Sequence, residues 1–169
     1  MTLKCDWFVL CQQVIWDKGT DALTLVNCLE QVTSSSFPSL HHGFAFAARF
    51  TWAGEPLKEP LDTHFKLVRW SEMDDKQTTV IELDGRLEPE TTLARVFTNF
   101  SFMKLNRPER VWFGLESRVG GGRWRKGPAV SVDVKEMDKG LAVRVQRGME
   151  RLRKSMEEEL ATTLPPDSD

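Results

Sequence analysis

A basic, glycine-rich segment holds the residue types best suited to chemistry. Between Lys104 and Lys126 the chain carries seven basic residues against two acidic ones, although its formal net charge is -2. Successive glycine N–H groups, here at residues 120–122, can bind an anion, arginines can hold a phosphate by two hydrogen bonds, and an exposed tryptophan can stack on a base. The pattern predicts a nucleic-acid or phosphate-ligand site in loop 118–127, formed by Arg118, Arg123, Trp124, Arg125 and Lys126.

The same segment also fits a purely structural interpretation. A hairpin tip rich in arginine keeps a sheet edge soluble, and Trp124 would then fold back on the sheet. The segment lacks the Gly-Lys-Ser/Thr ending of a nucleotide-binding P-loop.

Other catalytic or metal-binding patterns are weak. We expect His41 and His42 in a loop and His64 near the start of a strand, without the spacing of a metal site. Cys11 lies in an apolar run, away from the exposed, electropositive setting that activates a thiol. The sequence therefore predicts no metal, no cofactor and no enzyme.

The cysteines and the N-terminus bear on the compartment. Cys5, Cys11 and Cys28 are odd in number and lie in apolar runs, so we expect buried, reduced thiols. The first residues lack a signal-peptide pattern, and no apolar run approaches the ~20 residues of a membrane span. These features predict a cytoplasmic protein that does not enter a membrane.

Two hydrophobic periods divide the chain. Apolar residues mostly alternate from Cys5 to Val134, as in strands, and large ones alternate with small or polar ones around Phe44 to Trp52. About eight strands separated by turn residues predict a mainly β fold, an antiparallel β-sandwich over residues 1–135 with a C-terminal amphipathic helix over 136–162. Residues 163–169 are expected to form a disordered tail.

The helical segment carries a narrow apolar stripe with spacings of four, four, three, four and four residues: Leu141, Val145, Met149, Leu152, Met156 and Leu160. One interpretation packs this stripe on the outer face of the protein's own sheet, over Trp7, Val9 and Cys11. The other is an interface with a protein partner or a second copy of the chain.

The N-terminal third resembles a family of uncharacterised small bacterial β-sandwich proteins, a domain of unknown function. The resemblance rests on Phe8-Val9-Leu10-Cys11, the turn at Gly19 before Leu23-Thr24-Leu25-Val26, Phe37-Pro38, and the strand from Phe44 to Arg49-Phe50. It covers about the first fifty residues. It implies a compact bacterial β-sandwich and no particular activity.

Taken together, these features predict a non-enzymatic protein-interaction module, or a subunit of a larger bacterial assembly. The expected partner is another protein or a second copy of the chain. The alternative is nucleic-acid or phosphate-ligand binding through loop 118–127.

Overall fold

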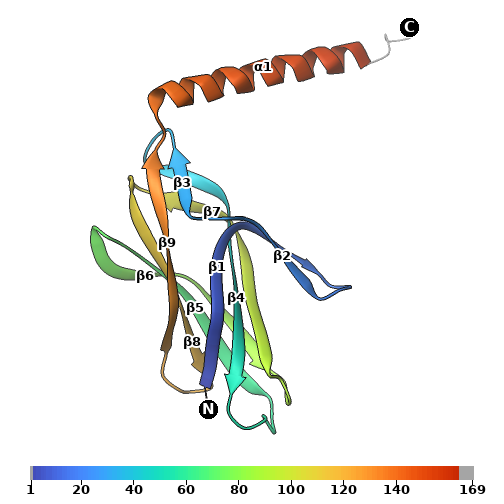
Figure 1. Cartoon of the computed structure of the whole chain (residues 1–169), viewed down its shortest axis with the longest axis vertical. Coiled ribbons are helices and arrows are strands. Elements are labelled where there is room, and N and C mark those ends of the chain that lie inside the picture. Colours follow the sequence, from blue (N-terminus) through green and yellow to red (C-terminus); the bar gives the residue numbers. More distant parts are fainter. Residues whose placement is uncertain (1, 164–169) are drawn as a thin grey trace.

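The chain forms two packed β-sheets followed by one helix (Figure 1). The computed structural model describes residues 2–163, except the side chains of residues 2, 139, 141, 142 and 158–163. Within this range the elements are β1 Thr2–Asp17, β2 Ala22–Cys28, β3 Gln31–Ser34, β4 Ser39–Ala53, β5 Leu61–Ser71, β6 Asp74–Leu87, β7 Leu93–Leu105, β8 Glu109–Val119, β9 Arg125–Glu136 and α1 Lys139–Thr163.

The strands are divided between two sheets, in the orders β2-β1-β4-β7 and β3-β9-β8-β5-β6. This architecture confirms the predicted mainly β sandwich with a C-terminal helix. It adds β3, a strand of four residues that pairs in parallel with β9 although every other pair is antiparallel. β3 was missed because so short a segment has too few alternations to read as a strand.

Alternation along β4 builds the core between the sheets. Phe44, Phe46 and Phe50 are at most 2% exposed and point toward the second sheet. Ring centroids lie 5.2 Å apart between Phe44 and Phe113 of β8, and 4.9 Å apart between Phe50 and Phe65 of β5. Large side chains on one parity of β4 therefore join the two sheets.

The other parity of β4 faces a second covering layer. Ala45 and Ala47 are fully buried although they lie on the outer face of their sheet. They are covered by a segment that we call the arm, the part of the β1–β2 hairpin from residue 12 to residue 27. β1 turns sharply where the arm begins (Figure 1). The small alanine side chains leave room for Val14 of the arm to pack against them.

Polar contacts fix the arm to β7. The Asn99 side chain accepts a hydrogen bond from the Val14 N–H at 2.8 Å and donates one to the Val14 carbonyl oxygen at 3.1 Å. Arg95 forms an ion pair with Asp21 at 3.0 Å. The outer face bearing Cys11 is thus covered by the chain's own arm and not, as one interpretation expected, by the C-terminal helix.

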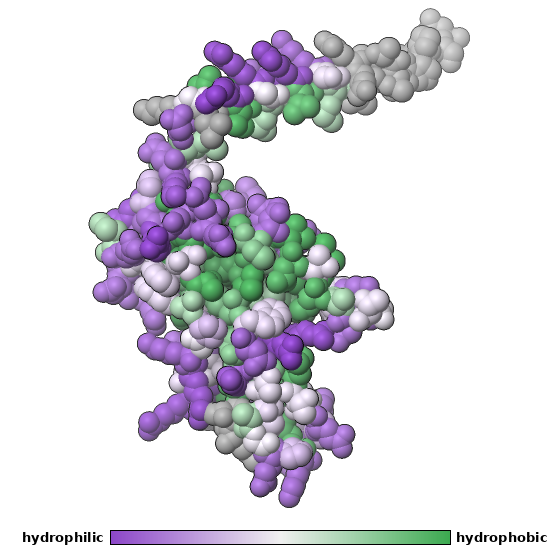
Figure 2. Space-filling model, in the orientation of Figure 1, coloured by the Kyte–Doolittle hydropathy of each residue, from purple (hydrophilic) through white to green (hydrophobic). Residues whose placement is uncertain are grey.

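α1 follows the end of β9 and crosses above that end of the sandwich in the view of Figure 1. Of the predicted stripe, Val145, Met149, Leu152 and Met156 are between 44% and 66% exposed. We call these four residues the α1 stripe; the side chains of Leu141 and Leu160, and the predicted tail from 164 to 169, lie outside the described part of the chain. The interpretation that the stripe packs on the protein's own sheet is therefore wrong. Figure 2 shows apolar residues along the edge of α1 that faces the sandwich and hydrophilic residues along the opposite edge.

Candidate ligand-binding site

The turn between β8 and β9 does not form the expected glycine nest. Gly120 has a φ of +52°, a left-handed conformation that favours glycine. Its N–H donates to the Asp62 carbonyl oxygen at 2.8 Å, and the Gly122 N–H donates to the Val119 carbonyl oxygen at 3.0 Å. Two of the three successive glycine N–H groups are therefore already used, which leaves no row of donors for an anion.

Trp124 folds back on the outer face of the second sheet. Lys66 Nζ lies 4.5 Å from its ring centroid, and the Arg118 guanidinium carbon lies 4.9 Å from it. Lys66 also forms a largely buried ion pair with Glu116 at 3.2 Å. Because cations flank its ring, Trp124 is placed as in the structural interpretation and does not offer a free stacking surface.

Arg118 belongs to the same outer cluster as Trp124. Its Nε is buried and has no hydrogen-bond partner within the described part of the chain. Residues 116 and 118 point outward from β8 while Ser117 and Val119 point inward, because side chains alternate along a strand. The five predicted site residues are consequently divided between two faces.

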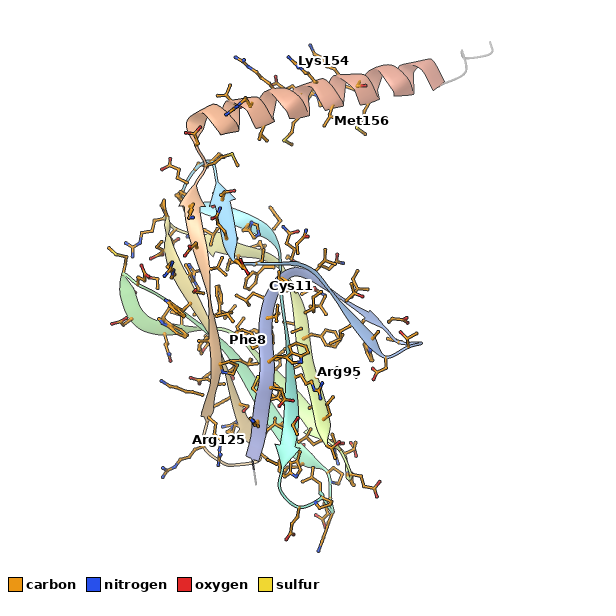
Figure 3. All side chains as sticks on the ribbon, in the orientation of Figure 1. Phe8, Cys11, Arg95, Arg125, Lys154 and Met156 are labelled. Atoms are coloured by element: carbon orange, nitrogen blue, oxygen red, sulfur yellow. The ribbon has the colours of Figure 1, made fainter. Side chains whose placement is uncertain are left out.

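Arg123 and Arg125 line a cavity of about 280 Å³ at the end of the sandwich where the N-terminus lies. Figure 3 labels Arg125 at the start of β9. The cavity lies between the ends of five strands and the β8–β9 turn. Its lining consists of Leu3, Trp52, Leu61, Ser117, Val119, Gly122, Arg123 and Arg125. The lining is thus an apolar floor with a buried serine and two arginines, and it contains no acidic residue.

The two arginines have no charged or hydrogen-bonded side-chain partner in the part of the chain that the structure describes. Neither Arg123 nor Arg125 takes part in an ion pair or side-chain hydrogen bond with any described residue, and the same holds for the exposed Lys126. At the other end of the basic segment Arg110 bonds to Asp133 at 2.7 Å, which holds the pKa of that carboxyl below its ordinary value. The unneutralised charge of the basic segment is therefore concentrated at the cavity end.

Close packing at Gly127 fixes the start of β9. A Cβ atom at this position would lie 2.6 Å from the Leu115 carbonyl oxygen, so a side chain would force the two strands apart. The β8–β9 register shifts between Gly114 and Glu116, next to this approach, and then places Arg125 opposite Ser117. The glycine thereby helps to place Arg125 at the cavity.

Sequence reasoning missed the residues that form the floor of the cavity. Leu3, Trp52 and Leu61 come from three different strands, far from residue 123 in the chain. Each looks like an ordinary core residue in its own strand. Only the strand order and register, which the sequence did not reveal, place them beside the basic turn.

Two smaller expectations are wrong. His41 and His42 lie in β4, not in a loop. Cys28 is exposed and Cys5 is partly exposed, so only Cys11 is the expected buried thiol. Among the described residues, no group of three or more His, Cys, Asp or Glu side chains is arranged to hold a metal ion.

Comparisons with known proteins identify little. No family model matches the chain, and no curated protein matches it. A similar solved structure is superoxide reductase (neelaredoxin) from Ignicoccus hospitalis, which is 12% identical, with a TM-score of 0.36, over 79% of this chain and 80% of that chain. The resemblance of the first fifty residues to a bacterial family stays a prediction.

This neighbour contradicts the prediction of a non-enzymatic protein-interaction module, because its name is that of an enzyme. At a TM-score of 0.36 the likeness assigns no fold, activity or metal to the present chain. No helix in the described part is long and apolar enough to cross a membrane. The cytoplasmic location stays a prediction.

Proposed function

We propose that the chain binds a small ligand with an anionic head, a phosphate or a carboxylate, on an apolar body. The observation that carries this proposal is a pair of arginines, without an ion-pair partner among the described residues, on a cavity with an apolar floor. Guanidinium groups bind such oxyanions by charge-assisted hydrogen bonds, and two of them can hold one head group from two sides.

The cavity suits a small ligand better than a nucleic acid. Its volume of about 280 Å³ is near the lower end of ligand pockets, and Leu3, Trp52 and Leu61 offer apolar contact to the body of a ligand. The Ser117 hydroxyl supplies a polar group deep in the lining, since this residue is 7% exposed. Trp124, the residue expected to stack on a base, is engaged by Lys66 and Arg118.

A calorimetric titration with phenyl phosphate tests the proposal. We expect saturable binding to the full chain, and a loss of at least about tenfold in affinity for Arg123→Gln or Arg125→Gln, since a hydrogen bond to a charged group contributes about 1.5–3 kcal/mol. Lys126→Gln is the matched control, because it removes one neighbouring positive charge from outside the cavity lining.

Two results would contradict this function. One is the absence of binding at millimolar phenyl phosphate. The other is an equal loss for Arg125→Gln and Lys126→Gln, which would indicate a diffuse charge effect. Tight binding of a single-stranded oligonucleotide that weakens steeply with salt, with all three cations contributing, would instead favour a nucleic-acid partner.

A second candidate role, self-association through α1, is favoured by the exposed α1 stripe. At 100° per residue its four members fall within about 60° of the helix circumference. Such a narrow apolar line can be covered by one partner helix, as in a coiled-coil seam.

The charges of α1 favour a second copy in antiparallel orientation as that partner. From its start to Lys154 the helix carries one acid, Glu150, against six basic residues, Lys139, Arg144, Arg147, Arg151, Arg153 and Lys154. Residues 157–159 are three glutamates. An antiparallel pair places each basic part beside the acidic part of the other copy, whereas a parallel pair places like charges together. A two-fold axis then lies near Leu152, which faces its own counterpart.

Sedimentation equilibrium distinguishes this arrangement from a monomer. We expect a concentration-dependent dimer that Leu152→Asp dissociates and Val143→Asp does not, because Val143 is 48% exposed on the opposite side of the helix. A mixture of Met149→Cys and Met156→Cys chains should cross-link between copies, which a parallel pair does not allow. A monomeric chain at all concentrations would overturn the proposal.

A further inference from the structure

Two cysteines lie directly opposite each other at the base of the arm. Cys11 of β1 and Cys28 of β2 are partners in the antiparallel register. The Leu29 N–H donates a hydrogen bond to the Leu10 carbonyl oxygen at 2.9 Å. Leu10 and Leu29 are the residues next to Cys11 and Cys28 on the side away from the arm. This pattern identifies Cys11 and Cys28 as a pair that exchanges no backbone hydrogen bonds, the type whose side chains approach most closely.

The geometry of such a pair suits a covalent link. Cα atoms of residues opposite each other without mutual hydrogen bonds lie about 4.5 Å apart, and their side chains project from the same face of the sheet. Disulfides usually span Cα separations of about 4.4–6.8 Å. We propose that Cys11 and Cys28 form a reversible disulfide that fastens the arm to the edge of its sheet.

The two thiols differ in solvent exposure, and this difference determines which of them reacts first. Cys28 is exposed, whereas Cys11 is fully buried beneath the arm. Burial and the nearby Cys28 thiol raise the pKa of Cys11. Cys28 is therefore the thiol that meets an external oxidant first, and Cys11 reacts afterwards from within.

The oxidant is a low-molecular-weight disulfide such as oxidised glutathione. The Cys28 thiolate attacks one sulfur of this disulfide, forms a mixed disulfide and releases one glutathione thiolate. The Cys11 thiol loses its proton to solvent, and its sulfur attacks Cys28 Sγ and releases the second glutathione. The two protein thiols thus lose two electrons and two protons, and one oxidised glutathione becomes two reduced molecules.

Cys5 provides an internal control. It lies opposite Phe50 in the register, and its thiol donates a hydrogen bond to the Trp7 carbonyl oxygen at 3.3 Å. Burial and the neighbouring Asp6 raise its pKa to about 11. Cys5 should therefore neither pair with the other two cysteines nor react readily with glutathione.

The test incubates the full-length native protein in glutathione buffers of increasing oxidised fraction and maps the products by peptide mass spectrometry. We expect a single Cys11–Cys28 linkage in the wild type and in Cys5→Ser. In Cys11→Ser the reaction should stop at glutathione attached to Cys28, and Cys28→Ser should stay reduced. Because the disulfide closes a loop in the unfolded chain, it should raise the melting temperature by several degrees. Reduction with dithiothreitol should reverse this increase.

Several results would overturn the proposal. These are wild-type protein that stops at glutathionylated Cys28, a linkage that involves Cys5, and a disulfide between the Cys28 residues of two copies. The Cys11→Ser variant shows whether Cys28 reacts with oxidised glutathione at all, independently of the second step. If it does and the wild type still forms no Cys11–Cys28 linkage, the geometry of the pair is at fault.

Discussion

The outer face of the β2-β1-β4-β7 sheet and the exposed edge of α1 are both apolar, yet only the former is covered by the chain. Over the sheet, small alanines accept the arm, and Asn99 and Arg95 hold it in place. The α1 stripe has no such partner among the described residues, and its side chains stay at least 44% exposed. Apolar residues thus mark surfaces to be covered, while neighbouring small and polar residues decide whether the chain itself covers them.

The largest effect should come from a charge placed under the arm. Ala47→Asp buries an unpaired carboxylate at a fully buried position and should lower the free energy of unfolding by more than about 3 kcal/mol. The same aspartate at Leu152 in α1 should change it by no more than about 0.5 kcal/mol in the monomer, because that side chain is exposed. Urea denaturation measures both, and equal losses would contradict the contrast between the two surfaces.

Local alternation made most of the fold predictable. Phe44 to Trp52 reads as a strand because its side chains alternate between the core and a second face, and the stripe of α1 reads as a helix for the corresponding reason. Sequence periodicity carries no information on pairing partners, however. The position of the arm depends on contacts such as Asn99 with Val14, which join residues 85 positions apart.

The candidate site was predictable only in part. Arg123 and Arg125 stood out by charge, and they line the cavity. Trp124 stood out equally, but it lies on the outer face of β8 and β9. The sequence could not show this, because the alternation of side chains cannot be followed through three glycines. The apolar floor gave no signal, since Leu3 and Trp52 have the character of core residues.

The next largest effect concerns the polar attachment of the arm. Asn99→Ala removes an acceptor and a donor from the Val14 backbone and should cost about 1–2 kcal/mol of unfolding free energy. Ser101→Ala, an exposed polar-to-alanine change on the same strand, serves as the control and should cost less than about 0.5 kcal/mol. If thermal denaturation gives the same melting temperature for both variants, the side-chain clamp contributes nothing to the arm.

A smaller, pH-dependent effect should belong to the sandwich and not to α1. Burial and the neighbouring His42 lower the pKa of His41 below its ordinary 6.5. The unfolded chain therefore binds a proton at this site more readily than the folded chain, and the stability should fall as the pH drops below about 6.5. His41→Gln should flatten this part of the curve of stability against pH. An unchanged curve would mean that the native environment does not disfavour the imidazolium.

Removal of α1 should have the smallest effect, and it tests most directly the claim that the sandwich covers its own apolar face without help from the helix. The chain is ended after Asp138, which keeps the hydrogen bond from the Met137 N–H to the Ser34 carbonyl oxygen. At low protein concentration, urea unfolding should give the free energy of unfolding of the full-length chain to within about 0.5 kcal/mol. A loss of several kcal/mol would contradict the account, because it would mean that α1 covers apolar surface of its own sandwich.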